Sequence, residues 1–179
     1  MNDTNPHAGA GDPVWVSMLD EETQVLKDRV FDYLFDLEVK KATRYQYFLA
    51  VLFLELDHGA GGRPVEEQEK ARQRQLKVLA DLLRDELRST DIIGRFADGR
   101  FSVLLHHADE VNTQRIGERI RRRIHDYVFS QENPGHRTVS IGGACFPGSG
   151  NYADDLRGAA LKMMERAKID GGNKVCTTS

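Results

Sequence analysis

Cysteines and long apolar runs are scarce in this sequence. It has 2 cysteines in 179 residues, and Cys145 and Cys176 stand far apart. This excludes the disulfide framework of a small secreted protein and indicates free thiols in a reducing compartment. No apolar run reaches the ~20 residues of a membrane span, and the polar, acidic start is unlike a secretory signal peptide. We therefore expect a cytoplasmic protein without a membrane partner.

An excess of positive charge is also lacking. The formal net charge is −3 and the pI is about 6.1. Proteins that bind nucleic acids through bulk charge carry a basic excess instead. We therefore expect no nucleic-acid partner, and any anion-binding site has to be local.

The length and composition fit one folded domain. The chain is 40% hydrophobic and 30% charged, and a chain of this size can bury a sizeable core. Residues 1–19 are rich in Gly, Pro, Asn and Asp, which is typical of a flexible N-terminal lead. We predict that the domain itself spans residues 20–179.

Hydrophobic periodicity predicts alternating helices and strands along this domain. A helical pattern begins at Asp20, and residues 48–56 are apolar almost throughout, as in a central strand covered on both faces. Such alternation favours an α+β layer architecture. The other predicted elements are a helix over 66–87, a helix capped by Asp109 and running to Val128, a strand over 138–144 and a helix over about 153–168.

Residues 92–105 predict a β-hairpin. Ile92–Phe96 and Phe101–Leu105 are rich in β-branched and aromatic residues, and Asp98-Gly99 stands between them. An Asp-Gly pair suits the two left-handed positions of a type I′ turn. A hairpin of this kind is common and by itself indicates no function.

The hairpin and its flanks resemble a known family. The GGDEF family, the diguanylate cyclases that make the bacterial messenger cyclic di-GMP from GTP, has the frame Arg-aromatic-(turn)-Phe-x-x-Leu-Leu. This frame is present as Arg95, Phe96, Phe101, Leu104 and Leu105. The resemblance extends over about 20–179 and includes a Thr-x-Ser-Ile-Gly-x-Ala strand at 138–144. It implies a nucleotidyl-cyclase-like α+β fold with a central, mostly antiparallel sheet flanked by helices.

The residues that this family uses for catalysis are mostly replaced. The turn that gives the family its name reads Ala97-Asp98-Gly99-Arg100-Phe101 here. Glu55 and Asp57 stand at the family's metal-binding Asp-x-Asp and could still offer oxygen ligands. The cyclase reaction needs two metal ions, which a cationic Arg100 would repel. We predict a degenerate domain that is not an enzyme, with no catalytic residue, no metal site and no cofactor.

A second site of the family is retained. Active members often carry a product-inhibition site, Arg-x-x-Asp five residues before the turn, completed by an arginine on the next helix. Arg88, Asp91 and Arg119 stand at these three positions. Guanidinium groups bind phosphate or the guanine O6/N7 edge, and a carboxylate accepts from guanine N–H groups. The resemblance therefore predicts that Arg88, Asp91 and Arg119 bind cyclic di-GMP.

Three hypotheses for the function follow. The favoured one is a cyclic di-GMP receptor that acts through a homodimer or an unidentified protein partner, and Lys41 stands where the family has a basic residue that bridges to a second subunit. In the second, Arg88 and Asp91 form only a surface salt bridge and the domain is a nucleotide-independent interaction scaffold. The third is a noncanonical GTP-using enzyme built on Glu55, Asp57 and Lys168, which lacks the groups that two-metal chemistry needs most.

Overall fold

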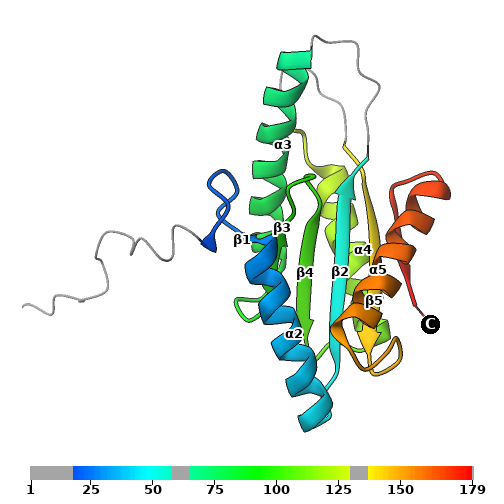
Figure 1. The fold of residues 1–179 in the computed structure, drawn as a ribbon. Coiled ribbons are helices and arrows are strands. Elements are labelled where there is room, and N and C mark those ends of the chain that lie inside the picture. Colours follow the sequence, from blue (N-terminus) through cyan, green and yellow to red (C-terminus); the bar gives the residue numbers. More distant parts are fainter. Residues whose placement is uncertain (1–17, 58–64, 130–136, 179) are drawn as a thin grey trace, which may run out of the picture.

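The computed structural model describes residues 18–57, 65–129 and 137–178 (Figure 1). Most of the predicted N-terminal lead, residues 1–17, lies outside these ranges. The described residues form four helices and a six-stranded sheet. The helices are α2 (Asp28–Tyr45), α3 (Val65–Glu86), α4 (Glu110–Asp126) and α5 (Ala153–Ile169).

The sheet has the strand order β1-β3-β4-β2-β5-β6. Its four inner strands pair antiparallel, whereas β1 and β6 each pair parallel at an edge. This confirms the predicted α+β fold with a mostly antiparallel sheet. The strands are β1 (Leu26–Lys27), β2 (Leu49–Leu56), β3 (Ile92–Arg95), β4 (Phe101–His106), β5 (Val139–Phe146) and β6 (Lys174–Thr177).

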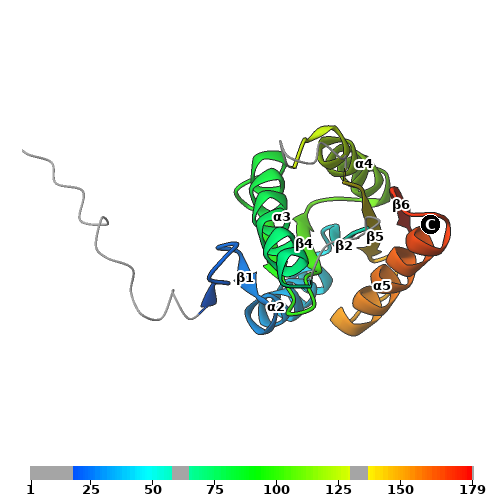
Figure 2. The same cartoon turned by 90° about the horizontal axis from the view of Figure 1, so that it is seen from above.

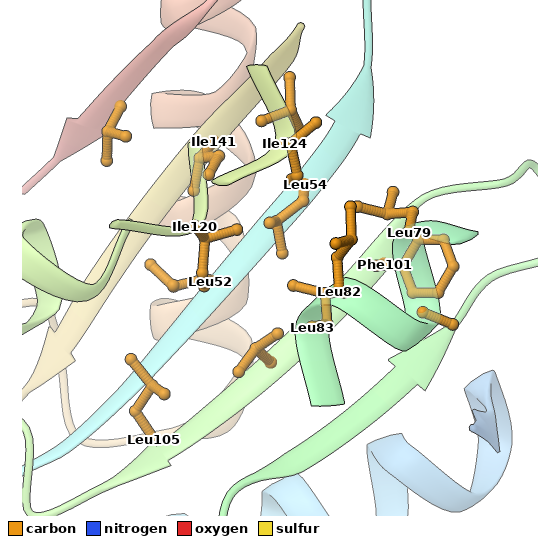
Figure 3. Close-up of a cluster of buried hydrophobic side chains, with 14 of the residues drawn as sticks. Leu52, Leu54, Leu79, Leu82, Leu83, Phe101, Leu105, Ile120, Ile124 and Ile141 are labelled. Atoms are coloured by element: carbon orange, nitrogen blue, oxygen red, sulfur yellow. The ribbon is translucent and has the colours of Figure 1, made fainter. Parts of the chain in front are cut away.

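Two helices cover each face of the sheet. Seen from above, α3 and α4 lie on one side of the strands and α2 and α5 on the other (Figure 2). The central strand β2 contributes Leu52 and Leu54 to the first core and Val51 and Phe53 to the second. Figure 3 shows the first core, in which side chains of α3 and α4 meet those of the sheet. The prediction of a strand that is covered on both faces is therefore confirmed.

The predicted helical start at Asp20 is wrong. The Asp20 carboxylate accepts hydrogen bonds from the backbone N–H (2.9 Å) and hydroxyl (2.6 Å) of Thr23. Gln24 then takes a left-handed backbone conformation, with φ of 55°. These local bonds compete with helix formation, so residues 20–25 form a turn, Leu26 and Lys27 form β1, and α2 begins only at Asp28.

The hairpin between β3 and β4 is confirmed, but its turn is not type I′. Gly99 is the only residue of the turn at positive φ (89°). The Gly99 N–H donates to the Phe96 carbonyl at 2.9 Å, and the Phe96 N–H donates to the Arg100 carbonyl at 2.8 Å. The loop is therefore Ala97, Asp98 and Gly99, the three-residue arrangement in which one left-handed glycine follows a tighter turn.

A buried arginine ties the N-terminal turn to the rest of the domain. The Arg95 side chain, only 9% exposed, pairs with Asp20 (2.7 Å) and Glu22 (3.2 Å). It also donates to the side-chain oxygen of Gln73 on α3 at 2.9 Å. Arg95 thus joins three segments that are far apart in sequence.

The remaining sequence predictions have mixed outcomes. Asp109 caps α4 as expected, its carboxylate accepting from the Asn112 N–H at 2.8 Å, but the helix ends at Asp126, before Val128. Both cysteines are free, and Cys145 is buried. Across 18–57, 65–129 and 137–178, none of the helices has the length and apolar character that crossing a bilayer requires.

Candidate functional site

The three predicted ligand-binding residues line one groove. Arg88 and Asp91 lie in the turn between α3 and β3, and Arg119 lies on α4. The groove encloses about 370 Å³, and its other walls come from the end of β4 and the first turns of α4. Those walls consist of Leu105, His106, His107, Ala108, Asn112, Arg115 and Ile116.

The carboxylate of Asp91 is fixed by the backbone of its own turn. One oxygen, Oδ2, accepts from the Arg88 N–H at 3.0 Å, and the Asp91 N–H donates to the Arg88 carbonyl at 3.0 Å. The ion pairs among the described residues do not include one between the Arg88 guanidinium and Asp91. The Arg88 side chain is exposed, so it is open to a ligand in the groove.

Arg119 is already engaged by an acidic residue. Its Nε lies 2.9 Å from Oε2 of Glu86, at the end of α3, and its guanidinium also donates to the Glu86 backbone carbonyl. Arg123 approaches the other oxygen of the same carboxylate at 3.6 Å. Glu86 therefore holds Arg119 against the end of α3.

Several groove residues were not predicted from the sequence. Arg115 precedes Arg119 by one helical turn, a spacing that puts both on one helix face, and this signal was available. His106 ends β4 and His107 follows it, and the centroid of the His107 ring lies 5.0 Å from that of the Tyr47 ring. No local sequence pattern reveals this contact, because Tyr47 lies just before β2, the strand that pairs with β4, and is far from His107 in sequence.

The acids that resemble metal ligands are occupied by protein groups. Glu55 pairs with Lys168 at 2.9 Å. Asp57 accepts from the hydroxyls of Thr138 and Ser140, both at 2.6 Å, and from the Asn173 N–H at 2.8 Å. Among the residues that the structure describes, no group of three or more His, Cys, Asp or Glu side chains could hold a metal ion. Glu55 and Asp57 are thus both engaged by protein donors in the structure.

The charges in the hairpin turn also pair with each other. Arg100 pairs with Asp98 at 2.5 Å, and Arg72 of α3 donates to the Asp98 carbonyl. The hydrogen bond that Arg100 donates to the Asp98 carboxylate raises the pKa of the Arg100 guanidinium above its ordinary value. Burial alone would raise the pKa of Asp98, but the bonds from Arg100 outweigh it and lower that pKa. The hydrogen bond to Glu55 likewise raises the pKa of Lys168.

One protein-family model matches more than half of this chain. A sequence model described as diguanylate cyclase, GGDEF domain, covers residues 69–174, from α3 to the start of β6. The chain belongs to the GGDEF family. The groove residues and the hairpin turn all lie within this matched range.

Relatives of known sequence are distant. An uncharacterized protein of Bacillus subtilis, YhcK, is 27% identical over 98% of this chain. The diguanylate cyclase DosC of Escherichia coli is 27% identical over 88% of this chain, and the cyclic di-GMP phosphodiesterase NbdA of Pseudomonas aeruginosa is 26% identical over 70%. The matches span 49% of YhcK, 34% of DosC and 16% of NbdA, so the chain corresponds to only part of each.

Solved GGDEF domains share the fold. The coiled coil and GGDEF domain of DgcB from Caulobacter crescentus, in complex with c-di-GMP, superposes with a TM-score of 0.80 at 18% identity. That match covers 90% of this chain and 86% of the DgcB chain. The GGDEF domain of FimX from Pseudomonas aeruginosa gives 0.79 at 22% identity, over 91% of this chain and all of the other.

Proposed function

We propose that this GGDEF domain is a receptor that binds cyclic di-GMP and does not make it. The observation that carries the proposal is that Arg88, Asp91 and Arg119, which come from two separate segments, line one groove. The names of the relatives and neighbours support the choice of ligand, since they include a cyclic di-GMP phosphodiesterase and a domain in complex with c-di-GMP.

The chemistry of the groove suits this ligand. Cyclic di-GMP carries two phosphate charges and guanine edges, and the forked guanidinium of Arg88 can pair with either. Asp91 uses only Oδ2 in its turn bond, which leaves Oδ1 to accept from the N–H groups of a guanine. Arg planes also stack on bases. The groove thus combines cations for phosphate with a fixed acceptor for guanine.

The proposed loss of cyclase activity rests on Arg100 in the hairpin turn and on the acids Glu55 and Asp57. Joining two GTP molecules needs two metal ions and charge neutralisation at the phosphates. Arg100 stands in the turn, where the family has an acid, and Glu55 and Asp57 are engaged by Lys168 and by hydroxyl and backbone donors. The domain therefore has no catalytic residue, metal or cofactor to assign.

The receptor needs an output, for which we propose a second copy of the domain or a protein partner. Ligand binding at an exposed groove changes the surface that such a partner meets. We place this activity in the cytoplasm, where the free Cys145 and Cys176 would stay reduced. Light scattering of the protein with and without cyclic di-GMP separates the homodimer from a protein partner.

Calorimetric titration of cyclic di-GMP tests the proposal. We expect binding by the wild type, a loss of at least about tenfold in affinity for Arg88→Ala and for Asp91→Asn, and no heat with GTP. Arg44→Ala, on the exposed end of α2, is the matched control and should bind like the wild type. A wild type that binds no cyclic di-GMP contradicts the proposal and favours a nucleotide-independent scaffold. Magnesium-dependent GTP consumption that Glu55→Ala abolishes would favour an enzyme instead.

A further inference from the structure

One wall of the groove carries an exposed imidazole. His107 follows the last residue of β4 and lines the groove between His106 and Ala108. In the part of the chain that the structure describes, its ring nitrogens have no hydrogen bond and no ion pair. The ring is therefore a planar group on the groove wall whose polar edge is available to a ligand.

The backbone of His107 takes an uncommon conformation. Its φ of 55° lies in the left-handed region, and this residue turns the chain from the end of β4 toward Asp109, the N-cap of α4. Glycine and asparagine adopt the left-handed region at lower cost than other residues. The turn alone therefore does not explain an imidazole here, and side chains held in this way are frequent at ligand sites.

The ring of His107 is supported from the side of α2. The centroid of the Tyr47 ring lies 5.0 Å away, with the two rings tilted by 45°, a separation at which aromatic rings attract each other. The Tyr47 hydroxyl donates to the Glu38 carboxylate at 3.0 Å, and the Glu38 side chain is only 13% exposed. Burial, together with the bond to Glu38 and its charge, raises the pKa of Tyr47 to about 12, so the hydroxyl stays a donor at neutral pH. Glu38, Tyr47 and His107 thus form a chain of contacts from α2 to the groove.

We propose that His107 stacks on a guanine base of cyclic di-GMP and that Tyr47 positions its ring for this contact. The inference rests on the proposed function and assigns two residues that the family resemblance did not indicate. Planar side chains, histidine included, stack on nucleobases, and every base offers a π-face for such a contact. Arginines bind any phosphate, whereas His107 adds a contact that only a ligand with a base can make.

Calorimetric titrations of cyclic di-GMP into variants of His107 test the stacking. His107→Asn keeps a residue that tolerates the left-handed backbone and removes the ring, so we expect affinity to fall about fivefold or more. His107→Phe keeps a flat face without ring nitrogens and should bind within about twofold of the wild type. A loss in His107→Phe as large as in His107→Asn would mean that the nitrogens make the contact, and stacking would be wrong.

Two variants of Tyr47 test the positioning role. Tyr47→Leu keeps apolar packing but removes the ring beside His107, and we expect affinity to fall about threefold or more. Tyr47→Phe restores the ring and should recover most of this loss. Tyr33→Leu is the matched control, since Tyr33 is on α2 and is 70% exposed, and it should bind like the wild type. Wild-type affinity in Tyr47→Leu would remove Tyr47 from the account. Thermal melting of each variant without ligand identifies any that is misfolded.

Proton NMR of the His107 ring gives a readout that a purely structural role would not change. The carbon-bound ring protons, assigned by their absence in His107→Asn, should move upfield as cyclic di-GMP saturates the protein, because a stacked base shields them. Downfield movement, as protonation of the ring produces, or unchanged signals at saturation would overturn the stacking.

The outcomes separate this inference from the function on which it rests. If the wild type binds and Arg88→Ala does not, but His107→Asn binds like the wild type, the receptor stands and His107 is not part of its site. No binding by the wild type overturns both proposals.

Discussion

Replacing Arg95 by methionine is expected to lower the free energy of unfolding by about 2–3 kcal/mol. The Arg95 side chain is 9% exposed and its strongest partner, Asp20, is 26% exposed. A hydrogen bond to a charged group contributes about 1.5–3 kcal/mol, and a half-exposed pair such as that with Glu22 adds about 0–1 kcal/mol. Methionine restores part of the apolar packing, so the net loss stays below the sum of these contributions.

Urea denaturation measures this change in the free energy of unfolding. The double-mutant cycle of Arg95→Met with Asp20→Asn should give a coupling energy of about 1–2 kcal/mol, because the two side chains bond directly. Arg122→Met, a change at a side chain that is 73% exposed, should alter the free energy of unfolding by less than about 0.5 kcal/mol. A loss below about 0.5 kcal/mol for Arg95→Met, or strictly additive changes in the cycle, would refute the role assigned to Arg95.

Three further predictions follow from other contacts. Burial alone would raise the pKa of Asp20, but the hydrogen bonds from Thr23 and Arg95 hold it below its ordinary value of 3.8. The stabilisation from these bonds is complete above pH 3.8 and is lost as the pH falls through the folded-state pKa of Asp20. The difference in unfolding free energy between the wild type and Arg95→Met should therefore shrink when unfolding is measured at decreasing pH, and a constant difference would contradict this role of Asp20. Gly142→Ala would put a Cβ 2.0 Å from the Met164 nitrogen of α5, so we expect a loss of at least about 3 kcal/mol or no folding in urea titrations, and wild-type stability would be inconsistent with this packing. Arg100→Glu restores one acid to the turn without supplying metal ligands, and chromatography of its reaction with magnesium and GTP should show no cyclic di-GMP; product formation would refute the account of lost activity.

The fold could be predicted largely from the sequence because its signals are local. The apolar run of β2 and the cap at Asp109 depend on residues within one element, and both predictions are confirmed. The start of α2 was misjudged because the Thr23 bonds to Asp20 compete with the helix, an effect that hydrophobic periodicity does not register. The turn type was misjudged because Asp-Gly fits both a two-residue and a three-residue loop.

The candidate site could be predicted only where its residues stand at a recognisable spacing in the sequence. Arg88 and Asp91 are three residues apart, and the resemblance indicated Arg119. The structure brings the three to one groove, and their role in ligand binding stays a prediction. The hold of Glu86 on Arg119 was not predictable, since it depends on how the end of α3 packs against α4. The same is true of the bonds to Asp57, whose donors Thr138 and Asn173 lie far along the chain.

The central claim is that cyclic di-GMP binds in the groove between the Arg88–Asp91 turn and α4, and side-chain NMR of the arginines tests it most directly. Nε–Hε signals, assigned with single arginine variants, are followed while cyclic di-GMP is added to the labelled protein. We predict saturable shifts for Arg88 and Arg119, with the signals of Arg95 and Arg100 unchanged. Shifts confined to Arg100, or no shifts at all up to millimolar ligand, would contradict it.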